Sequence, residues 1–284
     1  MGDSCCHPRG IGSIKQQIED AFPGIFVFSV ATGQTENEDV LSTYFGNAND
    51  QVARACELLS SMPELRGRAF VGVGFSQGGL LLRALIQRCT GPDAPRAHTL
   101  VTMGSPHNGV SGVPGCWING VGRAPLEYGW CEAMQALLGE GAYYSWLQSG
   151  LIQAQYFKDP FHLDWYLACS GFLADVNNDR PATNASYAEA LRSLQRLVLF
   201  QFENDITVVP RQSAHFGFYN GSVVVPLNET DNYIDDKLGL RTLAESGRLT
   251  LDFCPGFHMQ FTLDWFRDNV TRKFLGVAVE AAAA

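Results

Sequence analysis

One hexapeptide constrains the fold of this chain more than any other stretch: Gly-Phe-Ser-Gln-Gly-Gly at residues 74–79. It follows the short apolar run 70–73 and precedes the apolar, helix-forming stretch 80–86. A strand, a tight turn and a helix around Gly-x-Ser-x-Gly form the pattern of a nucleophile elbow, in which the turn presents the serine. Glycine is expected two residues on either side of Ser76, because a Cβ there would collide with the neighbouring strand or helix. The pattern predicts Ser76 as a nucleophile; an ordinary glycine-rich strand–helix connection is the alternative.

Strand and helix signals alternate through the first hundred residues. Runs rich in β-branched and aromatic residues indicate strands, and apolar residues at helical spacing indicate helices. This alternation is typical of a parallel sheet that is flanked by helices and joined by right-handed crossovers. The predicted elements are a helix at 13–21, a strand at 25–30, a helix at 50–62, a strand at 68–73 and a strand at 99–103.

The alternation stops after residue 109, and no strand is predicted again until 197–202. The intervening residues 110–190 are rich in Gly, Trp and Tyr. Their apolar and aromatic content exceeds what a solvated loop needs. We expect them to form a helical cap inserted into a single domain that spans 1–284. The remaining predicted elements are helical fragments near 131–138, 142–156 and 163–167, short strands at 223–225 and 249–253, and a last helix at 261–274.

A serine hydroxyl needs a base to take its proton and a carboxylate to orient that base. In α/β-hydrolases the chain order is Ser, then Asp or Glu, then His, each in the loop after a strand. His258 follows the last predicted strand and is therefore the predicted base; His107 also follows a strand but precedes any suitable acid. Asp205 comes directly after the strand 197–202 and is the predicted acid, with Asp252 as a weaker alternative.

The acylation step of such a triad generates an oxyanion that needs N–H donors. One predicted donor is the backbone N–H of Gln77, the residue after the nucleophile. The second donor normally follows an early strand, and Met1-Gly2-Asp3 is the only early candidate. This favours a chain whose upstream segment is missing. Paired metal ligands, a phosphate-binding loop and a dinucleotide motif are absent from the sequence, so we expect no metal and no cofactor.

Composition bears on partners and compartment. The formal net charge of −9, with scattered Lys and Arg, argues against a nucleic-acid surface. No stretch is long and apolar enough to predict a transmembrane helix, and no apolar signal core follows Met1. Eight cysteines without a C-x-x-C pair, together with four glycosylation sequons, favour an oxidising secretory compartment. The sequons begin at Asn184, Asn220, Asn228 and Asn269.

Several longer motifs now point to one family. The most specific are Met-Gly-Asp-Ser-Cys-Cys at the start of the chain and the Gly-Phe-Ser-Gln-Gly-Gly elbow. The sequence resembles the lysosomal palmitoyl-protein thioesterases, and the resemblance runs over nearly the whole chain. The matching stretches are 1–6, 74–79, 87–89, 141–143, 159–160, 172–175, 204–205, 216–219 and 238–240.

This resemblance implies an α/β-hydrolase fold and the hydrolysis of long-chain fatty acyl thioesters on cysteines of S-acylated proteins. It implies the same triad of Ser76, Asp205 and His258, and a lysosomal or secreted location. It further implies oxyanion donors at Met1 and Gln77, acyl-chain contacts at Phe157 and Val208, and the disulfide pairs Cys5–Cys6, Cys56–Cys89 and Cys116–Cys131.

The chain also departs from the family pattern. The family reads His-Gly before this Met-Gly-Asp, preceded by a strand and a signal peptide, so we expect the first strand to be missing here. Gly104–Gly109 is more lipase-like than the family version, which leaves a lipase or carboxylesterase as an alternative function. A catalytically inactive lipid-binding relative is a third interpretation. Cys169 and Cys254 have no obvious family partner; they either pair with each other or stay free and buried.

Overall fold

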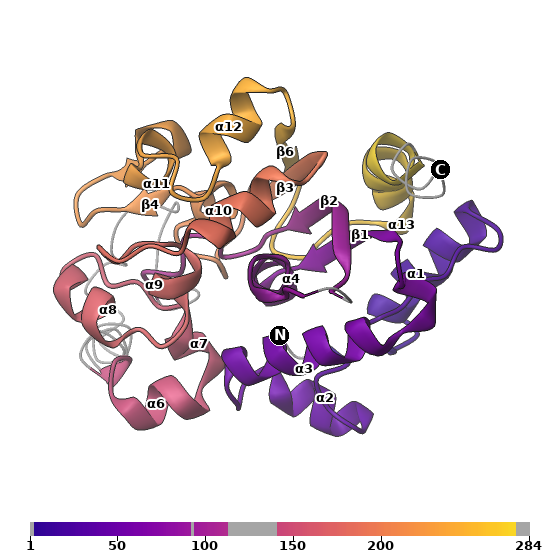
Figure 1. The fold of residues 1–284 in the computed structure, drawn as a ribbon, viewed down its shortest axis with the longest axis horizontal. Helices are drawn as coiled ribbons and strands as arrows, with labels where there is room; N and C mark the ends of the chain where they lie inside the picture. Colours follow the sequence, from indigo (N-terminus) through magenta and orange to yellow (C-terminus); the bar gives the residue numbers. More distant parts are fainter. Residues whose placement is uncertain (1–2, 92–93, 113–140, 277–284) are drawn as a thin grey trace.

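A sheet of four parallel strands lies at the centre of the part of the molecule that the structure describes (Figure 1). This computed structural model describes residues 3–91, 94–112 and 141–276. All neighbouring strands pair in parallel, in the order β1-β2-β3-β6. The prediction of a mostly parallel sheet flanked by helices is therefore confirmed. The strands are β1 Ala69–Phe75, β2 Arg96–Met103, β3 Arg196–Phe202 and β6 Leu249–Cys254.

Both faces of the sheet are covered, as the near-continuous apolar sequence of β3 indicates. Alternate side chains of a strand point to opposite faces. Val198, Phe200 and Phe202 accordingly pack with α1 (Ile11–Ala21), α13 (Leu263–Phe266) and the π-helical η4 (Arg267–Leu275). Leu197 and Leu199 pack on the other face with α10 (Ala185–Arg192) and α12 (Leu240–Glu245). Figure 1 shows α4 and α10 in front of the sheet.

The other helices connect or flank the strands. The nucleophile motif leads into α4, and the described residues between β2 and β3 include five short helices. Besides those named above, the described elements are α2 Glu36–Ser42, α3 Ala48–Ser61, η1 Pro63–Leu65, α4 Gln77–Arg88, α6 Ser145–Gly150, α7 Ile152–Gln155, α8 Leu163–Cys169, α9 Leu173–Val176, η2 Arg211–His215, β4 Phe218–Tyr219, β5 Val224–Val225, η3 Leu227–Glu229 and α11 Asp231–Ile234.

The strand predicted at 25–30 is wrong, because these residues form no ladder with another strand. A strand needs a neighbour for its backbone N–H and C=O groups, and β2 is the strand that pairs with β1 in the described structure. Phe26 and Phe28 still stack on one another, with ring centroids 6.4 Å apart, and both are exposed. β-branched and aromatic content alone therefore did not decide the structure of this segment.

Two other predicted elements differ in detail from the structure, and a third is not tested. The short strand predicted at 223–225 is found as Val224–Val225, which pairs antiparallel with Phe218–Tyr219 in a separate small sheet. The helix predicted at 142–156 is divided at Leu151, which is extended and forms an antiparallel bridge with Phe45. The fragment predicted at 131–138 lies outside the described residues.

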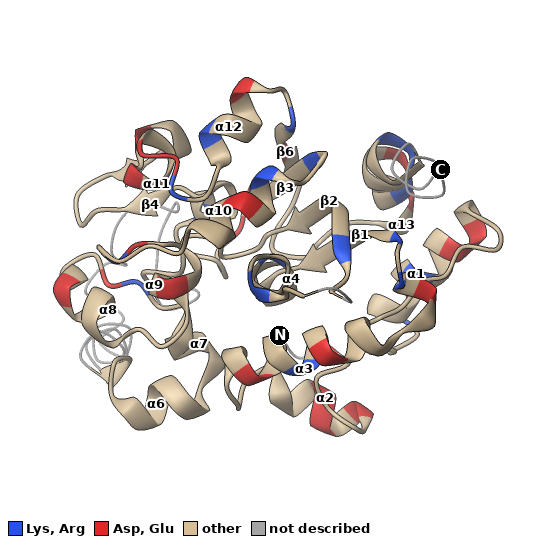
Figure 2. Cartoon of the chain, in the orientation of Figure 1, with Lys and Arg blue, Asp and Glu red and all other residues tan. Residues whose placement is uncertain are grey.

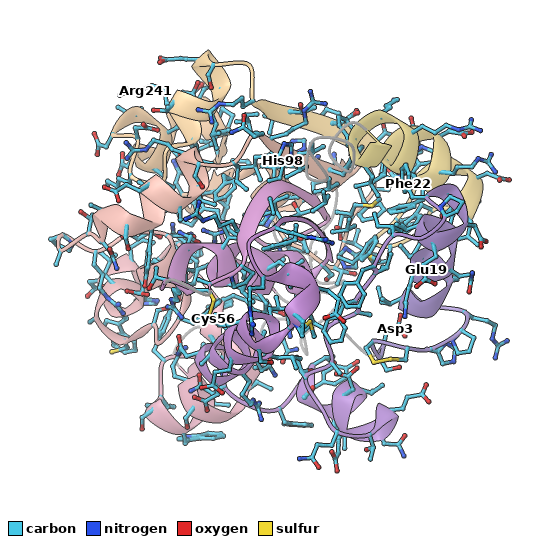
Figure 3. The ribbon with its side chains drawn as sticks, turned by 45° about the vertical axis from the view of Figure 1, so that its right-hand side comes forward. Asp3, Glu19, Phe22, Cys56, His98 and Arg241 are labelled. Atoms are coloured by element: carbon cyan, nitrogen blue, oxygen red, sulfur yellow. A yellow bond between two sulfur atoms is a disulfide. The ribbon has the colours of Figure 1, made fainter. Side chains whose placement is uncertain are left out.

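Two disulfides are present in the described structure. Cys5 and Cys6 are bonded to each other, and Cys56 of α3 is bonded to Cys89 at the end of α4 (Figure 3). Cys116 and Cys131 lie outside the described residues. Cys169 and Cys254 are both free, so these two cysteines do not pair. Cys254 is buried as predicted, but the prediction of burial is wrong for Cys169, which is exposed.

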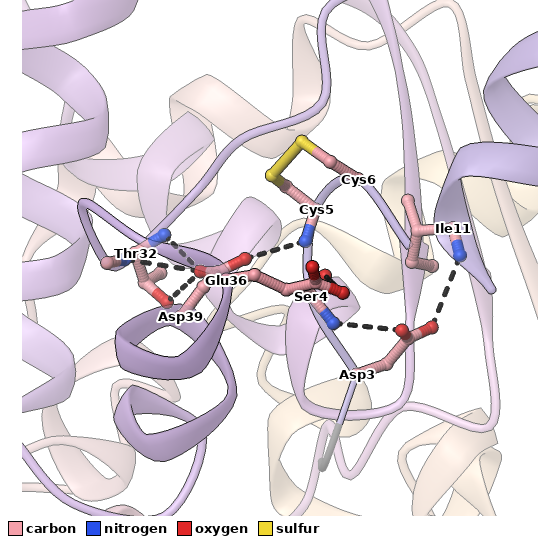
Figure 4. The surroundings of a disulfide bond; sticks show 9 residues. Asp3, Ser4, Cys5, Cys6, Ile11, Thr32, Glu36 and Asp39 are labelled. Carbon is pink, nitrogen blue, oxygen red and sulfur yellow. Dashed lines mark hydrogen bonds between the residues drawn. A yellow bond between two sulfur atoms is a disulfide. The ribbon is translucent and has the colours of Figure 1, made fainter. Parts of the chain in front are cut away.

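The buried carboxylate of Asp39 ties the N-terminal segment to the loop before α2 (Figure 4). Its Oδ2 accepts a hydrogen bond of 2.6 Å from the backbone N–H of Cys5. Its Oδ1 accepts from the backbone N–H of Thr32 at 2.6 Å, from the Thr32 hydroxyl at 2.8 Å and from the Gly33 N–H at 3.2 Å. Charge-assisted hydrogen bonds of this kind are the stronger ones in proteins.

We expect Asp39→Ala to lower the free energy of unfolding by about 3 kcal/mol, because it leaves several part-buried donors without this acceptor. Chemical denaturation of the purified protein measures this value. Glu57→Ala, which removes an exposed carboxylate from α3, serves as the matched control. An Asp39→Ala protein as stable as the control would show that these hydrogen bonds do not hold the segment.

Candidate active site

The carboxyl ends of the parallel strands meet at one edge of the sheet, and the predicted triad lies at this edge. Ser76 follows β1, Asp205 comes three residues after β3, and His258 comes four residues after β6. The sequence separates Ser76 from His258 by 182 positions, yet their side chains are in contact. The shared direction of the strands is what brings these loops together.

The turn at Ser76 has the strained geometry of a nucleophile elbow. Ser76 has φ 50° and ψ −129°, a region that non-glycine residues rarely adopt. Its backbone N–H donates to the carbonyl of Met103 at the end of β2, at 2.8 Å. That contact anchors the strained residue to the neighbouring strand.

The glycines of the elbow differ in their steric roles. A Cβ on Gly74 would lie 2.4 Å from Gly79 Cα, and a Cβ on Gly79 would lie 2.0 Å from Ser105 Oγ. A Cβ on Gly78 would meet nothing within 4 Å. The expected collision is therefore found at Gly74, but the prediction for Gly78 is wrong, because the close approach falls on the following glycine instead.

The three side chains predicted as a triad form a continuous chain of hydrogen bonds. His258 Nε2 lies 2.9 Å from Ser76 Oγ, and His258 Nδ1 lies 2.6 Å from Asp205 Oδ2. Ser76 and Asp205 are buried, and 13% of the His258 side chain is exposed. With a proton on Nδ1 donated to Asp205, Nε2 is free to accept the proton of the serine hydroxyl.

The local backbone after β3 orients Asp205. Its second oxygen, Oδ1, accepts hydrogen bonds from the N–H groups of Thr207 at 2.8 Å and Val208 at 2.9 Å. The carboxylate is thereby fixed with one oxygen toward the turn and the other toward His258. The weaker candidate Asp252 lies within β6 and accepts a hydrogen bond from the N–H of Phe253 instead.

His107, the rival for the base, is fully buried away from this chain of hydrogen bonds. Its Nε2 lies 2.9 Å from Thr102 Oγ1, and its ring stacks on Phe216 with centroids 4.8 Å apart. Burial, and next the positive charge of Arg83, lower the pKa of His107 well below its usual value. The imidazole therefore stays neutral at neutral pH and has a packing role.

The residues predicted to bind the oxyanion and the acyl chain lie in separate parts of the fold. Gln77 is buried and is the first residue of α4. The N–H groups in the first turn of a helix do not donate to carbonyls of the same helix, so the Gln77 N–H can serve a ligand. Val208 is buried beside the acid, while Phe157 is buried after α7 and forms a parallel bridge with Val110. Met1 lies outside the described residues.

The sequence did not reveal a buried polar network behind the elbow. Arg83 of α4 donates to the carbonyl oxygens of Val176 and His107 and to Asn177 Oδ1. Lys158 pairs with Asp179 at 3.0 Å, and Tyr166 donates to the same carboxylate at 2.7 Å. These contacts join the nucleophile helix and the loop after β2 to the segment 156–179. The one signal in the sequence is Arg83 itself, the single charge in an otherwise apolar helix stretch.

Figure 2 shows Lys and Arg scattered over the ribbon without a continuous stripe. In residues 3–91, 94–112 and 141–276, no three His, Cys, Asp or Glu side chains gather as metal ligands would. No helix in these same ranges is long and apolar enough to cross a membrane.

A parallel sheet with a serine elbow, an acid and a histidine at its carboxyl edge defines an α/β-hydrolase. Comparison with known proteins narrows this class. The sequence model of the family described as palmitoyl protein thioesterase matches residues 1–258. The chain belongs to the palmitoyl protein thioesterase family, and it is an enzyme of the hydrolase class.

Individual relatives agree with the family. The chain is 38% identical over 277 residues to palmitoyl-protein thioesterase 1 of Caenorhabditis elegans, which covers 96% of this chain and 89% of that protein. It is 32% identical over 271 residues to palmitoyl-protein thioesterase 3 of Dictyostelium discoideum, and this match covers 90% of this chain and 86% of that protein. A protein of Mus musculus named lysosomal thioesterase PPT2 is 32% identical over 183 residues, and this match covers 64% of this chain and 56% of that protein.

The two buried histidines predict how stability depends on pH. Burial lowers the pKa of His107 and of His215, so the unfolded chain, with an ordinary value near 6.5, binds more protons than the folded chain. The contribution of these two histidines to the free energy of unfolding is therefore fully present above about pH 6.5, and it is lost as the pH is lowered. Each histidine contributes a slope of up to about 1.4 kcal/mol per pH unit.

We expect His107→Gln to flatten this slope by about one proton, because glutamine does not titrate. Denaturant unfolding at a series of pH values between 7 and 5 measures the slope, and His7→Gln at a half-buried position is the matched control. An unchanged slope in His107→Gln would contradict the assignment of a neutral, buried His107.

Proposed function

We propose that this protein hydrolyses long-chain fatty acyl thioesters on cysteines of S-acylated proteins, with Ser76 as nucleophile, His258 as general base and Asp205 as the orienting acid. The hydrogen-bond chain from Ser76 through His258 to Asp205 is the observation that carries this proposal. Membership of the palmitoyl protein thioesterase family supports the choice of a palmitoyl thioester over other acyl substrates.

In the acylation half of the reaction, Ser76 Oγ attacks the thioester carbonyl carbon while its proton moves to His258 Nε2. The developing oxyanion receives the backbone N–H of Gln77, with Met1 proposed as the second donor. Asp205 stabilises the imidazolium that forms. The C–S bond then breaks, and the cysteine sulfur leaves with the proton from His258. A thiolate leaves more readily than an alkoxide, so protonation of the leaving group is less demanding than in ester cleavage.

In the second half, water hydrolyses the acyl-serine. His258 Nε2 takes one proton from the water, whose oxygen attacks the acyl carbon through the same oxyanion arrangement. The bond from the acyl carbon to Ser76 Oγ breaks, and the serine oxygen recovers its proton from His258. The products are the free fatty acid and the regenerated enzyme, and each step uses only this chain's own side chains and water.

The acyl chain needs an apolar groove close to the triad. We assign residues 110–190 to a cap inserted into a single domain, and Phe157 and Val208 to the groove wall. The position of Val208 supports this assignment, because its N–H bonds the acid itself. Phe157 belongs to the segment that bridges Val110, which continues the loop after β2. Acylated proteins and peptides are the proposed partners.

A lysosomal location is proposed because relatives carry the name lysosomal thioesterase. The two disulfides of the described structure are compatible with an oxidising compartment. Co-localisation of the tagged protein with a lysosomal marker in cells tests the location, and a purely cytosolic signal would contradict it.

Ser76→Ala is expected to abolish turnover of a palmitoyl-cysteine peptide, by about 10⁴-fold or more, because no other described group replaces the nucleophile. The variant should remain folded, since alanine is smaller than serine. Release of free thiol measures turnover, and circular dichroism checks the fold. Turnover that persists in Ser76→Ala would contradict the proposed mechanism.

The same assay separates a thioesterase from a lipase or carboxylesterase. We expect the palmitoyl thioester to have a higher kcat/KM than a triacylglycerol or a short oxygen ester. Phe157→Ala should lower kcat/KM more for palmitoyl than for hexanoyl substrates, because the short chain does not reach as far along an apolar groove. A preference for short oxygen esters would overturn the substrate assignment, and an equal loss for both chain lengths would remove Phe157 from the groove.

The four sequons are not equally suited to glycosylation. Asn184, Asn220 and Asn228 are exposed. The side chain of Asn269 lies within η4, where its amide donates to the Trp265 carbonyl and accepts from Lys273 Nζ. We therefore propose glycans on the first three asparagines only.

Protein secreted from eukaryotic cells should lose one glycan mass in each of Asn184→Gln, Asn220→Gln and Asn228→Gln. Asn269→Gln is the matched control and should leave the mass of the glycosylated protein unaltered apart from the substitution. Mass spectrometry before and after glycosidase treatment makes this comparison. Occupancy at Asn269 would contradict the assignment.

A further inference from the structure

Tyr156 contacts the residue that follows the nucleophile. Its hydroxyl lies 3.4 Å from Gln77 Oε1, and the two residues are only 4% and 5% exposed. Burial raises the pKa of Tyr156, so the hydroxyl stays protonated and donates to the glutamine oxygen. No role for Tyr156 follows from the elbow motif or from the order of the triad residues, because it lies 79 positions from Gln77.

Tyr156 is itself held on two sides. Its hydroxyl also hydrogen-bonds the side chain of Gln153, which donates to the carbonyl of Thr43 at 3.0 Å. Its backbone carbonyl accepts from the N–H of Val110 at 3.0 Å, in the loop after β2. The phenol therefore reaches Gln77 from a segment that is fixed to two other parts of the fold.

Gln77 needs such a contact from outside its own helix. It lies between the strained Ser76 and the pair Gly78–Gly79, and glycine restricts the backbone less than any other residue. The first residue of a helix also lacks an intrahelical partner for its N–H. Small rotations of this peptide would re-aim the N–H that is proposed to receive the oxyanion, and a donor must be pre-aligned to stabilise a transition state.

We propose that Tyr156 is a positioning residue that holds the side chain of Gln77 and thereby fixes the Gln77 N–H in the oxyanion hole, linking the segment after α7 to the nucleophile elbow. This inference rests on the proposed function of Ser76 and Gln77. Tyr156 does not touch the reacting atoms. Its hydroxyl acts through Gln77, and so its effect belongs to the transition state and not to ground-state binding of the acyl chain.

The test begins with Tyr156→Phe, which removes the hydroxyl and keeps the ring. With a palmitoyl thioester we expect kcat to fall about five- to tenfold, as one neutral hydrogen bond allows, while KM stays within about twofold. Tyr187→Phe is the matched control, because that buried tyrosine bonds Arg88 and Asp175 outside the site. Its kcat should remain that of the unmodified protein.

A double-mutant comparison separates this role from a structural one. Gln77→Met keeps an unbranched side chain but removes the amide oxygen. If Tyr156 acts through Gln77, then Tyr156→Phe lowers kcat in the native background and has no further effect in the Gln77→Met background. An equal loss in both backgrounds, or a native kcat in Tyr156→Phe, overturns the inference.

A second readout makes the test independent of the thioester substrate. A fluorophosphonate probe reacts when Ser76 Oγ bonds to phosphorus, fluoride leaves and His258 takes the serine proton, with the phosphonyl oxygen in the oxyanion hole. The labelling rate should fall in Tyr156→Phe by a factor similar to that in kcat. If the unmodified protein is labelled but does not turn over the thioester, the proposed substrate fails and the labelling rates still decide the role of Tyr156. If it is not labelled at all, both proposals are overturned.

Discussion

The hydrogen-bonded register of four parallel strands is the constraint on which the rest of the structure depends. Because β1, β2, β3 and β6 run in the same direction, every loop that leaves a carboxyl end emerges at the same edge. Ser76, Asp205 and His258 each follow a different strand, and reversing any one of these three strands would move its residue to the opposite edge of the sheet. The triad geometry is thus a consequence of strand direction, and local turns supply the final orientation.

Buried polar contacts then fix what the apolar core leaves free. The strained backbone of Ser76 is anchored by the carbonyl of Met103, and the carboxylate of Asp205 is fixed by two backbone N–H groups of its own turn. Farther from the edge, Arg83 and the Lys158–Asp179 pair connect the nucleophile helix with the segment between β2 and β3. Apolar packing is tolerant of small shifts, whereas a buried donor without an acceptor is costly, so these contacts specify one arrangement.

Prediction from the sequence succeeded where local pattern and chain order carry the information. The elbow at 74–79 lies between β1 and α4 as the strand–turn–helix pattern predicts. The order Ser, Asp, His selected the three side chains that the structure brings into hydrogen-bonding contact, and it separated His258 from His107. It failed where structure depends on a distant partner: residues 25–30 have strand-like composition but no neighbouring strand to pair with, and Gly78 has open space because Gly79 makes the close approach.

The sequence by itself determined the fold class, the strand–turn–helix position of Ser76 and the family, because each of these rests on residues that are close together or on their order along the chain. Only the tertiary structure decided that His107 is a neutral packing residue, that Asn269 is engaged within a helix, and that Tyr156 reaches Gln77. Each of these depends on burial or on a contact between distant segments. Neither quantity is encoded in local spacing, because a side chain's solvent exposure and partners are set only when the strands and helices pack.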